Sequence, residues 1–167
     1  VIDTVNPVIT LKKYTKDNKG KVVVPGHHNY SLVAFVEDTN IDTIKLNGED
    51  YVPGKEIWDR ISYTLVVTDK AGRTATIEFT IDKDYPSVVI NGKKYEKNVK
   101  DTIYYDGAVT PTVTDTNLET LTLNGAEYVS GTEVTEDGNY TLIAKDKAGN
   151  TTTVNFVIDT VNPVINL

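Results

Sequence analysis

The sequence predicts an all-β protein made of two similar β-sandwich domains, and three observations lead to this expectation. Segments of alternating apolar and polar residues recur about every 8 to 12 residues, whereas no window keeps apolar residues at helical spacing. Three Asn-Gly pairs mark tight turns of the kind that join neighbouring strands. The second half of the chain also repeats the first half at a constant offset of 77 residues.

The repeat keeps its register over most of its length. The motif Asp-Lys-Ala-Gly occurs at residues 69–72 and again at 146–149, and 11 of 20 positions are identical between residues 38–57 and 115–134. A period of this size is that of a small domain rather than of a solenoid repeat. We therefore expect one domain over residues 1–82 and a second over 83–160. Because residues 157–165 repeat residues 1–9 letter for letter, residues 161–167 are expected to begin a following repeat.

The first copy contains about seven candidate strands. In residues 74–81 the side chains of Ala75, Ile77, Phe79 and Ile81 fall on one face, and threonines and a glutamate fall on the other, as in a half-buried strand. The same alternation returns at Thr152, Val154, Phe156 and Ile158. Seven strands with turns at this spacing predict a two-sheet sandwich of the immunoglobulin-like type. The expected strands are residues 8–12, 21–24, 30–36, 43–46, 49–52, 63–68 and 74–81.

Turn chemistry supports this strand assignment. Asn-Gly is favoured in two-residue hairpin loops because both central residues need a positive φ. The pairs at residues 47–48, 91–92 and 124–125 are each expected to close a hairpin. In the Asp-Lys-Ala-Gly turns, the aspartate is expected to accept hydrogen bonds from the turn backbone.

The connection between the two copies is short. Residues 82–85 contain no glycine or serine, which are the residues of a flexible linker. Pro7, Pro86 and Pro163 occupy the same place in each copy, where a fixed φ suits entry into an edge strand. These features favour a stiff joint and an elongated rod.

Composition excludes several classes of function. The formal charge of −7 disfavours nucleic acid as a partner, because phosphate backbones would be repelled. The segment has no apolar run long enough for a membrane span and no signal-peptide pattern. With no cysteine, the chain has neither disulfides nor thiolate chemistry, and each small domain must be held by its core alone.

Several motifs together resemble the bacterial immunoglobulin-like repeats that occur in tandem on surface and secreted proteins of Gram-positive organisms. The resemblance covers the whole chain and implies an extracellular location, at the cell surface or secreted, with neighbouring repeats of the same chain as partners. Its motifs report turns and core positions rather than a ligand. They are Ile-Asp-Thr-x-x-Pro-Val-Ile at 2–9 and 158–165, Leu-Asn-Gly followed by Tyr at 46–51 and 123–128, Glu-Asp-Gly-Asn-Tyr-Thr-Leu at 136–142, and Asp-Lys-Ala-Gly at 69–72 and 146–149.

Catalytic, cofactor and metal sites are not expected. No catalytic motif is present, and the four serines have only His27 and His28 as candidate bases, so the chain is not expected to be an enzyme. Adjacent histidines on an extended chain point in opposite directions and chelate poorly. Asp82 and Asp84 at the joint offer carboxylates for calcium, as do Asp3, Asp38 and Asp115 near strand ends, but no calcium-loop motif surrounds them. We therefore expect no metal and no cofactor.

Aromatic residues outside the shared core pattern are the remaining binding candidates. Trp58, Tyr104 and Tyr105 are assigned as speculative binding residues, with Tyr95 as a further exposed aromatic, because a flat ring can stack on a sugar or anchor a partner. The expected function is a non-catalytic spacer, stalk or adhesive segment of a bacterial surface protein. A host or cell-surface protein or a glycan is the candidate ligand. The alternative is a carbohydrate-binding accessory segment of a secreted enzyme.

Overall fold

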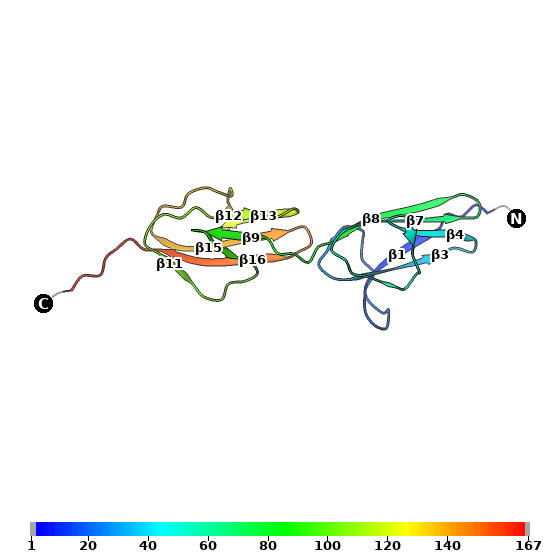
Figure 1. Ribbon diagram of the computed structural model, residues 1–167, viewed down its shortest axis with the longest axis horizontal. Coiled ribbons are helices and arrows are strands. Elements are labelled where there is room, and N and C mark those ends of the chain that lie inside the picture. The colour runs from blue at the N-terminus through cyan, green and yellow to red at the C-terminus, as the bar shows by residue number, and fades with distance from the viewer. Residues whose placement is uncertain (1–2, 166–167) are drawn as a thin grey trace. The chain divides into compact units, whose positions relative to one another are not determined.

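The computed structural model describes residues 3–165, and its secondary structure over this range consists of β-strands without helices (Figure 1). The prediction of an all-β protein is therefore confirmed. The chain divides into two compact units, Val1–Lys83 and Asp84–Leu167. Residues 161–165 form no strand, and the expected start of a following repeat at 166–167 lies outside the described residues, as do residues 1–2 of the first motif.

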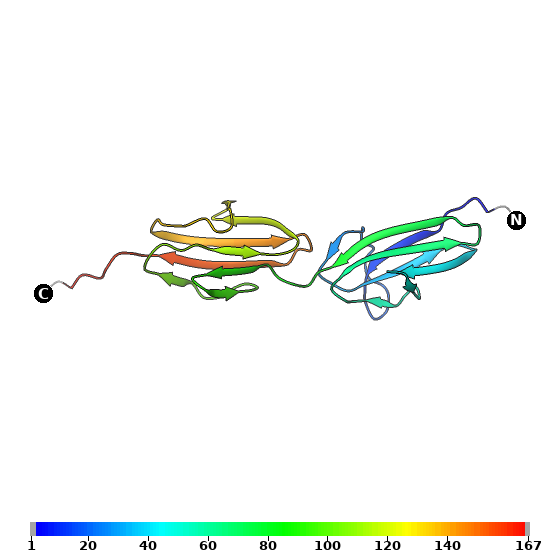
Figure 2. The ribbon, with the colours of Figure 1, turned by 45° about the horizontal axis from the view of Figure 1, so that its top comes forward.

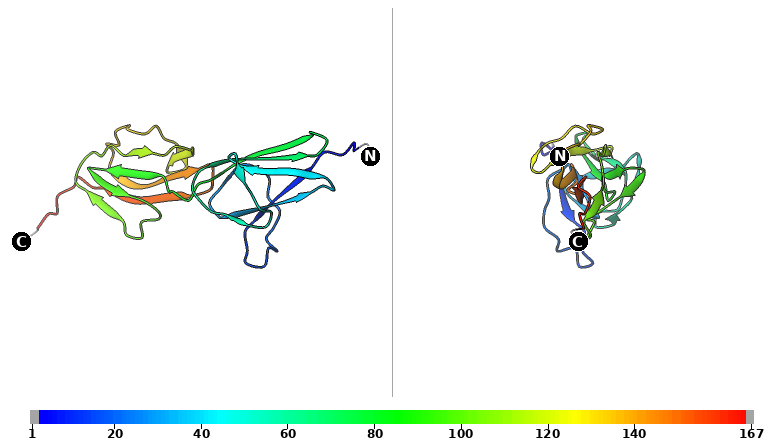
Figure 3. Two further views of the ribbon diagram at one scale, coloured as in Figure 1. Left: turned by 45° about the vertical axis from the view of Figure 1, so that its right-hand side comes forward. Right: turned by 90° about the vertical axis from the view of Figure 1, so that its left-hand side faces the viewer.

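The first unit contains eight strands in two sheets. The three-stranded sheet has the order β1-β3-β6, and the five-stranded sheet has the order β2-β8-β7-β4-β5. The long β7–β8 hairpin is plain in Figure 2, and the loop after β1 extends away from the sheets in Figure 3. The strands are β1 (Val8–Lys13), β2 (His27–His28), β3 (Leu32–Glu37), β4 (Ile41–Leu46), β5 (Glu49–Asp50), β6 (Glu56–Ile57), β7 (Ser62–Asp69) and β8 (Thr74–Ile81).

The second unit also contains eight strands. Its smaller sheet has the order β10-β9-β12, and its larger sheet has the order β11-β16-β15-β13-β14. The larger sheets of the two units therefore follow the same plan, with the last strand between a short parallel strand and its own hairpin partner. The strands are β9 (Ser87–Ile90), β10 (Lys93–Tyr95), β11 (Ile103–Tyr105), β12 (Thr112–Thr114), β13 (Leu118–Leu123), β14 (Ala126–Glu127), β15 (Gly138–Asp146) and β16 (Thr151–Ile158).

Each unit is sandwich-like, with an apolar core supplied by both of its sheets. Alternate residues of the last strands are buried, as the sequence pattern predicts. Tyr63 stacks on Phe79 with ring centroids 5.2 Å apart, and Tyr140 stacks on Phe156 at 5.1 Å. The same aromatic pair thus occupies the same register in both cores, although Tyr63 is buried and Tyr140 is only half-buried.

Two features of the first unit differ from the sequence-based strand assignment. The expected strand at residues 21–24 is wrong, because only Val22 forms an isolated bridge, to Lys12. Two strands were missed, β2 and β6, and each has only two residues. Such short strands are fixed by pairing with β8 and β3 rather than by a pattern of their own.

The Asn-Gly pairs form the three predicted hairpins. Both residues have positive φ in each turn, for example 51° at Asn47 and 86° at Gly48. Two of the asparagines also bind the strand beside the hairpin, which the sequence did not reveal. Asn124 Oδ1 accepts the Thr141 N–H at 2.8 Å, and Asn124 Nδ2 donates to the Asn139 carbonyl at 3.1 Å. Asn47 makes the equivalent pair of bonds in the first unit.

Replacing Asn124 with glycine is expected to lower the free energy of unfolding by about 1–2 kcal/mol. Glycine keeps the positive φ but removes the two side-chain bonds to β15. The matched control is Asn91→Gly, since Asn91 takes the same turn conformation and, within residues 3–165, makes no such bond to a neighbouring strand. Urea unfolding should separate the two variants; equal losses would assign the cost to the turn alone.

Candidate functional site

Trp58 lies directly after β6 and borders a shallow hollow in the first unit. Its side chain is 63% exposed, so its ring is available at the surface as predicted. The hollow has a volume of about 210 Å³. The Lys83 ammonium donates to the Trp58 carbonyl at 3.4 Å and to Ser31 Oγ at 3.2 Å. The residues around the hollow are Leu46, Glu49, Asp50, Tyr51, Lys55, Glu56, Ile57, Trp58, Asp59 and Tyr63.

The Trp58 hollow combines an aromatic face with acidic side chains. Four of its residues are acidic and one is basic, and the acidic Asp50 pairs with Lys45 at 2.7 Å. Aromatic faces stack on sugar rings, and carboxylates accept bonds from hydroxyl groups. The chemistry of this site therefore suits a neutral polyhydroxylated ligand better than an anionic one.

Tyr104 and Tyr105 belong to β11 in the second unit and face opposite ways. Tyr104 is 72% exposed. Tyr105 is half-buried, and its ring meets Phe156 edge-on with centroids 6.1 Å apart. Burial and the neighbouring Tyr95 hydroxyl raise the pKa of Tyr105 above its usual value. Of this pair, only Tyr104 presents a surface ring.

Tyr95 corrects the sequence-based assignment. It was grouped with the exposed aromatics, but it is buried in the core of the second unit. Its position in β10, opposite Val88 of β9, turns its ring inward. Tyr95 is therefore a core residue.

The two histidines occupy the same strand register as these tyrosines. His27 and His28 pair in parallel with Thr80 and Ile81, and Tyr104 and Tyr105, 77 residues later, pair in parallel with Val157 and Ile158. This equivalence could have been read from the repeat offset. The inward position therefore holds His28 in one unit and Tyr105 in the other.

His28 is buried as a neutral ring. Its Nε2 lies 3.0 Å from the Val24 carbonyl, which only accepts, so Nε2 carries the proton. Its Nδ1 then accepts from the Tyr30 hydroxyl at 3.0 Å. Burial, together with the neighbouring His27, lowers the pKa of His28 below 6.5, although the bond to Val24 opposes this shift.

The first unit is expected to lose stability when the pH falls below about 6.5. The unfolded chain takes up a proton near that pH, whereas folded His28 resists protonation, so the free energy of unfolding stays level above pH 6.5 and declines below it. The slope is at most about 1.4 kcal/mol per pH unit for one proton. Thermal melts of His28→Gln and His27→Gln test this. The decline should vanish only in the first variant, and a decline unchanged by His28→Gln would contradict the assignment.

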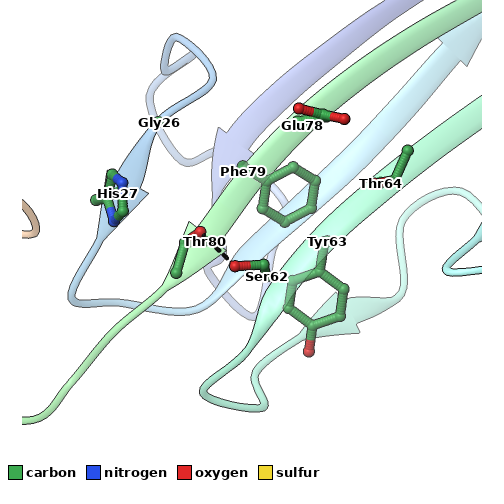
Figure 4. Close-up of a pocket in the computed structure, with 8 residues that line it drawn as sticks. All are labelled: Gly26, His27, Ser62, Tyr63, Thr64, Glu78, Phe79 and Thr80. Atoms are coloured by element: carbon green, nitrogen blue, oxygen red, sulfur yellow. Dashed lines mark hydrogen bonds between the residues drawn. The ribbon is translucent and has the colours of Figure 1, made fainter. Parts of the chain in front are cut away.

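A second hollow of about 350 Å³ lies where β2, β7 and β8 meet (Figure 4). The Ser62 and Thr80 hydroxyls pair across β7 and β8 at 2.9 Å. Figure 4 shows His27 on β2, apart from this hydroxyl pair. The arrangement ties strands together and provides a polar surface depression.

Three carboxylates gather in the first unit, at Asp3, Asp38 and Asp69. Each offers an oxygen within 4.8 Å of the others. Sequence analysis named Asp3 and Asp38 but not Asp69, which lies far away in the chain. Arg73 fills this cluster with its own positive charge, because its guanidinium pairs with Asp3 at 2.7 Å and Asp69 at 3.0 Å. The cluster is thus an ion-pair network within the fold.

The Asp-Lys-Ala-Gly turns are closed by their aspartates, as predicted. Asp69 Oδ1 accepts the Ala71 N–H at 2.8 Å and the Arg73 N–H at 2.9 Å. Burial opposes ionisation of Asp69, but the bonds from Arg73 and Ala71 outweigh it and lower the pKa. Asp146 Oδ1 likewise accepts the Asn150 N–H at 2.8 Å, and its Oδ2 accepts Asn150 Nδ2 at 2.7 Å.

Comparison with known proteins gives one informative similarity. A stretch of 83 residues, 47% of the chain, is 39% identical to the outer cell wall protein of Brevibacillus brevis. The match covers 8% of that protein, so the chain spans only a small part of this relative. No family model matches the chain. In residues 3–165 no helix is long and apolar enough to cross a membrane.

Proposed function

We propose that the chain is a non-catalytic structural segment of a bacterial cell-surface protein, in which tandem immunoglobulin-like modules serve as a spacer or adhesive stalk. The modules act mechanically. Sheet hydrogen bonds and a small apolar core keep each unit folded, and the number of units sets the reach of whatever the protein presents. This assignment includes an extracellular location and partners of the same kind, the neighbouring repeats.

The observation that carries the proposal is that the residues shared by both units are consumed by their own folds. The Tyr51 hydroxyl donates to the Lys55 carbonyl at 2.7 Å, and the equivalent Tyr128 hydroxyl lies between the Pro111 and Thr132 carbonyls. The turn aspartates bond their own turns, and the hairpin asparagines bond the adjacent strand. Duplicated residues with these roles preserve a module, not a reaction.

The similarity to an outer cell wall protein supports the cell-surface part of the proposal. That relative is named for its place in the cell wall, and the matched stretch corresponds in length to about one unit of this chain. An all-β module without thiols suits this setting, since it needs no redox partner to fold.

Stretching the chain by its two ends tests the spacer role. A spacer under load must stay folded, so force–extension traces should show two separate unfolding events, each releasing about the length of one unit. Smooth extension without such events would contradict the role. The trace needs only the chain itself, held between two inert handles.

A carbohydrate-binding role is the second candidate, and the Trp58 hollow is the observation that favours it. An exposed indole beside carboxylates is suited to a sugar face. A glycan array probed with the chain and with Trp58→Ala separates the candidates. Binding that disappears in Trp58→Ala but persists in Tyr104→Ala would support the sugar site, whereas no specific binding by the unmodified chain would favour the spacer.

A further inference from the structure

The last strand of the second unit is bonded to the segment by which the chain enters that unit. β16 pairs in parallel with β11, with Ile103, Tyr104 and Tyr105 opposite Phe156, Val157 and Ile158. Before β11, the Val99 N–H donates to the Thr153 carbonyl at 2.9 Å. The exit strand therefore holds several points of the entering chain.

Thr152 adds two bonds at the start of β16. Its hydroxyl donates to the Pro86 carbonyl at 2.6 Å and accepts the Lys97 N–H at 3.1 Å. Thr152 is fully buried, so water does not compete for these bonds. Pro86 is the residue just before β9, which makes this hydroxyl a direct link between the first and last strands of the unit.

The backbone at Lys97 is strained in order to make this link. Its φ is 64°, in the left-handed region, where the other non-glycine residues among those described are all asparagines. A lysine there costs about 1 kcal/mol or more. The surrounding structure must compensate, and the bond from Lys97 N–H to Thr152 is one compensating contact.

The first unit lacks this link. The residue 77 positions before Thr152 is Ala75, which has no hydroxyl. Its parallel pair is also shorter, with only His27 and His28 opposite β8. The two units thus share a core plan but differ in how the entering chain is tied to the exit strand.

We propose that Thr152, the backbone of Lys97 to Val99 and the β11–β16 pair form a load-bearing latch that makes the second unit the mechanically stronger module. This inference rests on the proposed spacer function and adds to it a division of strength between the units. The latch bonds are held by residues that the fold alone does not require, since the first unit folds on the same plan without them.

The direction of loading explains why these contacts matter. Tension pulls the entering chain back toward Pro86 and pulls β16 forward beyond Ile158. Because β11 and β16 run in parallel, these pulls act in opposite directions along the same axis. All the bonds of the contact are then stretched together rather than opened one at a time. Thr152 precedes Ile158 by about 20 Å of strand, so its bonds lie at the entry end of the loaded region.

Constant-force unfolding of the whole chain with Thr152→Val tests the latch. One of the two events should become about tenfold faster, because valine keeps the volume but removes both bonds, while the other event serves as an internal reference. In the unmodified chain that same event should be the slower one. Thr152→Ala should give the same result with an added cavity, and a melt of each variant confirms that it folds.

The matched control is Tyr128→Phe, which removes a buried hydroxyl bonded to the Pro111 and Thr132 carbonyls in the same unit. It should lower thermal stability without changing the unfolding rate under force, because these bonds lie outside the loaded contact. Equal rate changes in Thr152→Val and Tyr128→Phe, or none in Thr152→Val, would overturn the latch. The spacer role would survive either outcome as long as both units unfold in separate events.

Discussion

Replacing Phe156 with alanine is expected to lower the free energy of unfolding of the second unit by about 3–5 kcal/mol. The ring is fully buried, stacks on Tyr140 and meets the edge of Tyr105. Its loss would leave a cavity between the sheets that neighbouring strands, fixed by their hydrogen bonds, fill poorly. Calorimetry of the variant should show one transition at a lower temperature and the other unchanged.

Trp58→Ala is the control for this truncation. A tryptophan that is 63% exposed contributes little to the core, so the variant should lose less than about 1 kcal/mol. A loss as large as that of Phe156→Ala would place the indole in the core of the first unit. It would also remove Trp58 from the candidate binding surface.

The second large effect is expected for Asp146→Ala, with a loss of about 3 kcal/mol. The Asp146 side chain is 0% exposed and accepts bonds from the backbone and side-chain nitrogens of Asn150. Bonds to a carboxylate are among the stronger ones, and alanine would leave these buried donors unpaired. Urea unfolding of the variant measures the loss.

Asp101→Ala provides the comparison for Asp146→Ala. Asp101 is an exposed aspartate of the same unit, and its replacement should change stability by no more than about 0.5 kcal/mol. Similar losses in both variants would show that net charge, rather than the closed turn, determines the effect.

Much of the fold could be predicted because strands with one buried face carry a period of two. The alternation in β8 and β16 and the Asn-Gly turns located the long hairpins of both units. The short strands β2 and β6 carry no such signal, since two residues show no period. Residues 21–24 alternate like a strand, but only Val22 finds a partner.

The site residues were less predictable, because exposure depends on tertiary packing. The sequence identified Trp58 and Tyr104 as surface rings but placed the buried Tyr95 with them. The contacts of Thr152 with Pro86 and Lys97 join segments more than 50 positions apart, and no local pattern reports such distances. The Arg73 network with Asp3 and Asp69 was missed for the same reason.

Separate expression of residues 1–83 and 84–167 tests most directly the claim that the chain consists of self-sufficient structural modules. Each unit has its own core and its own pair of sheets, so each half should melt cooperatively, with a transition enthalpy of about 60 kcal/mol expected for its size. The two enthalpies should add up to that of the whole chain. A half that is unfolded alone and folds only when joined to the other would contradict the account.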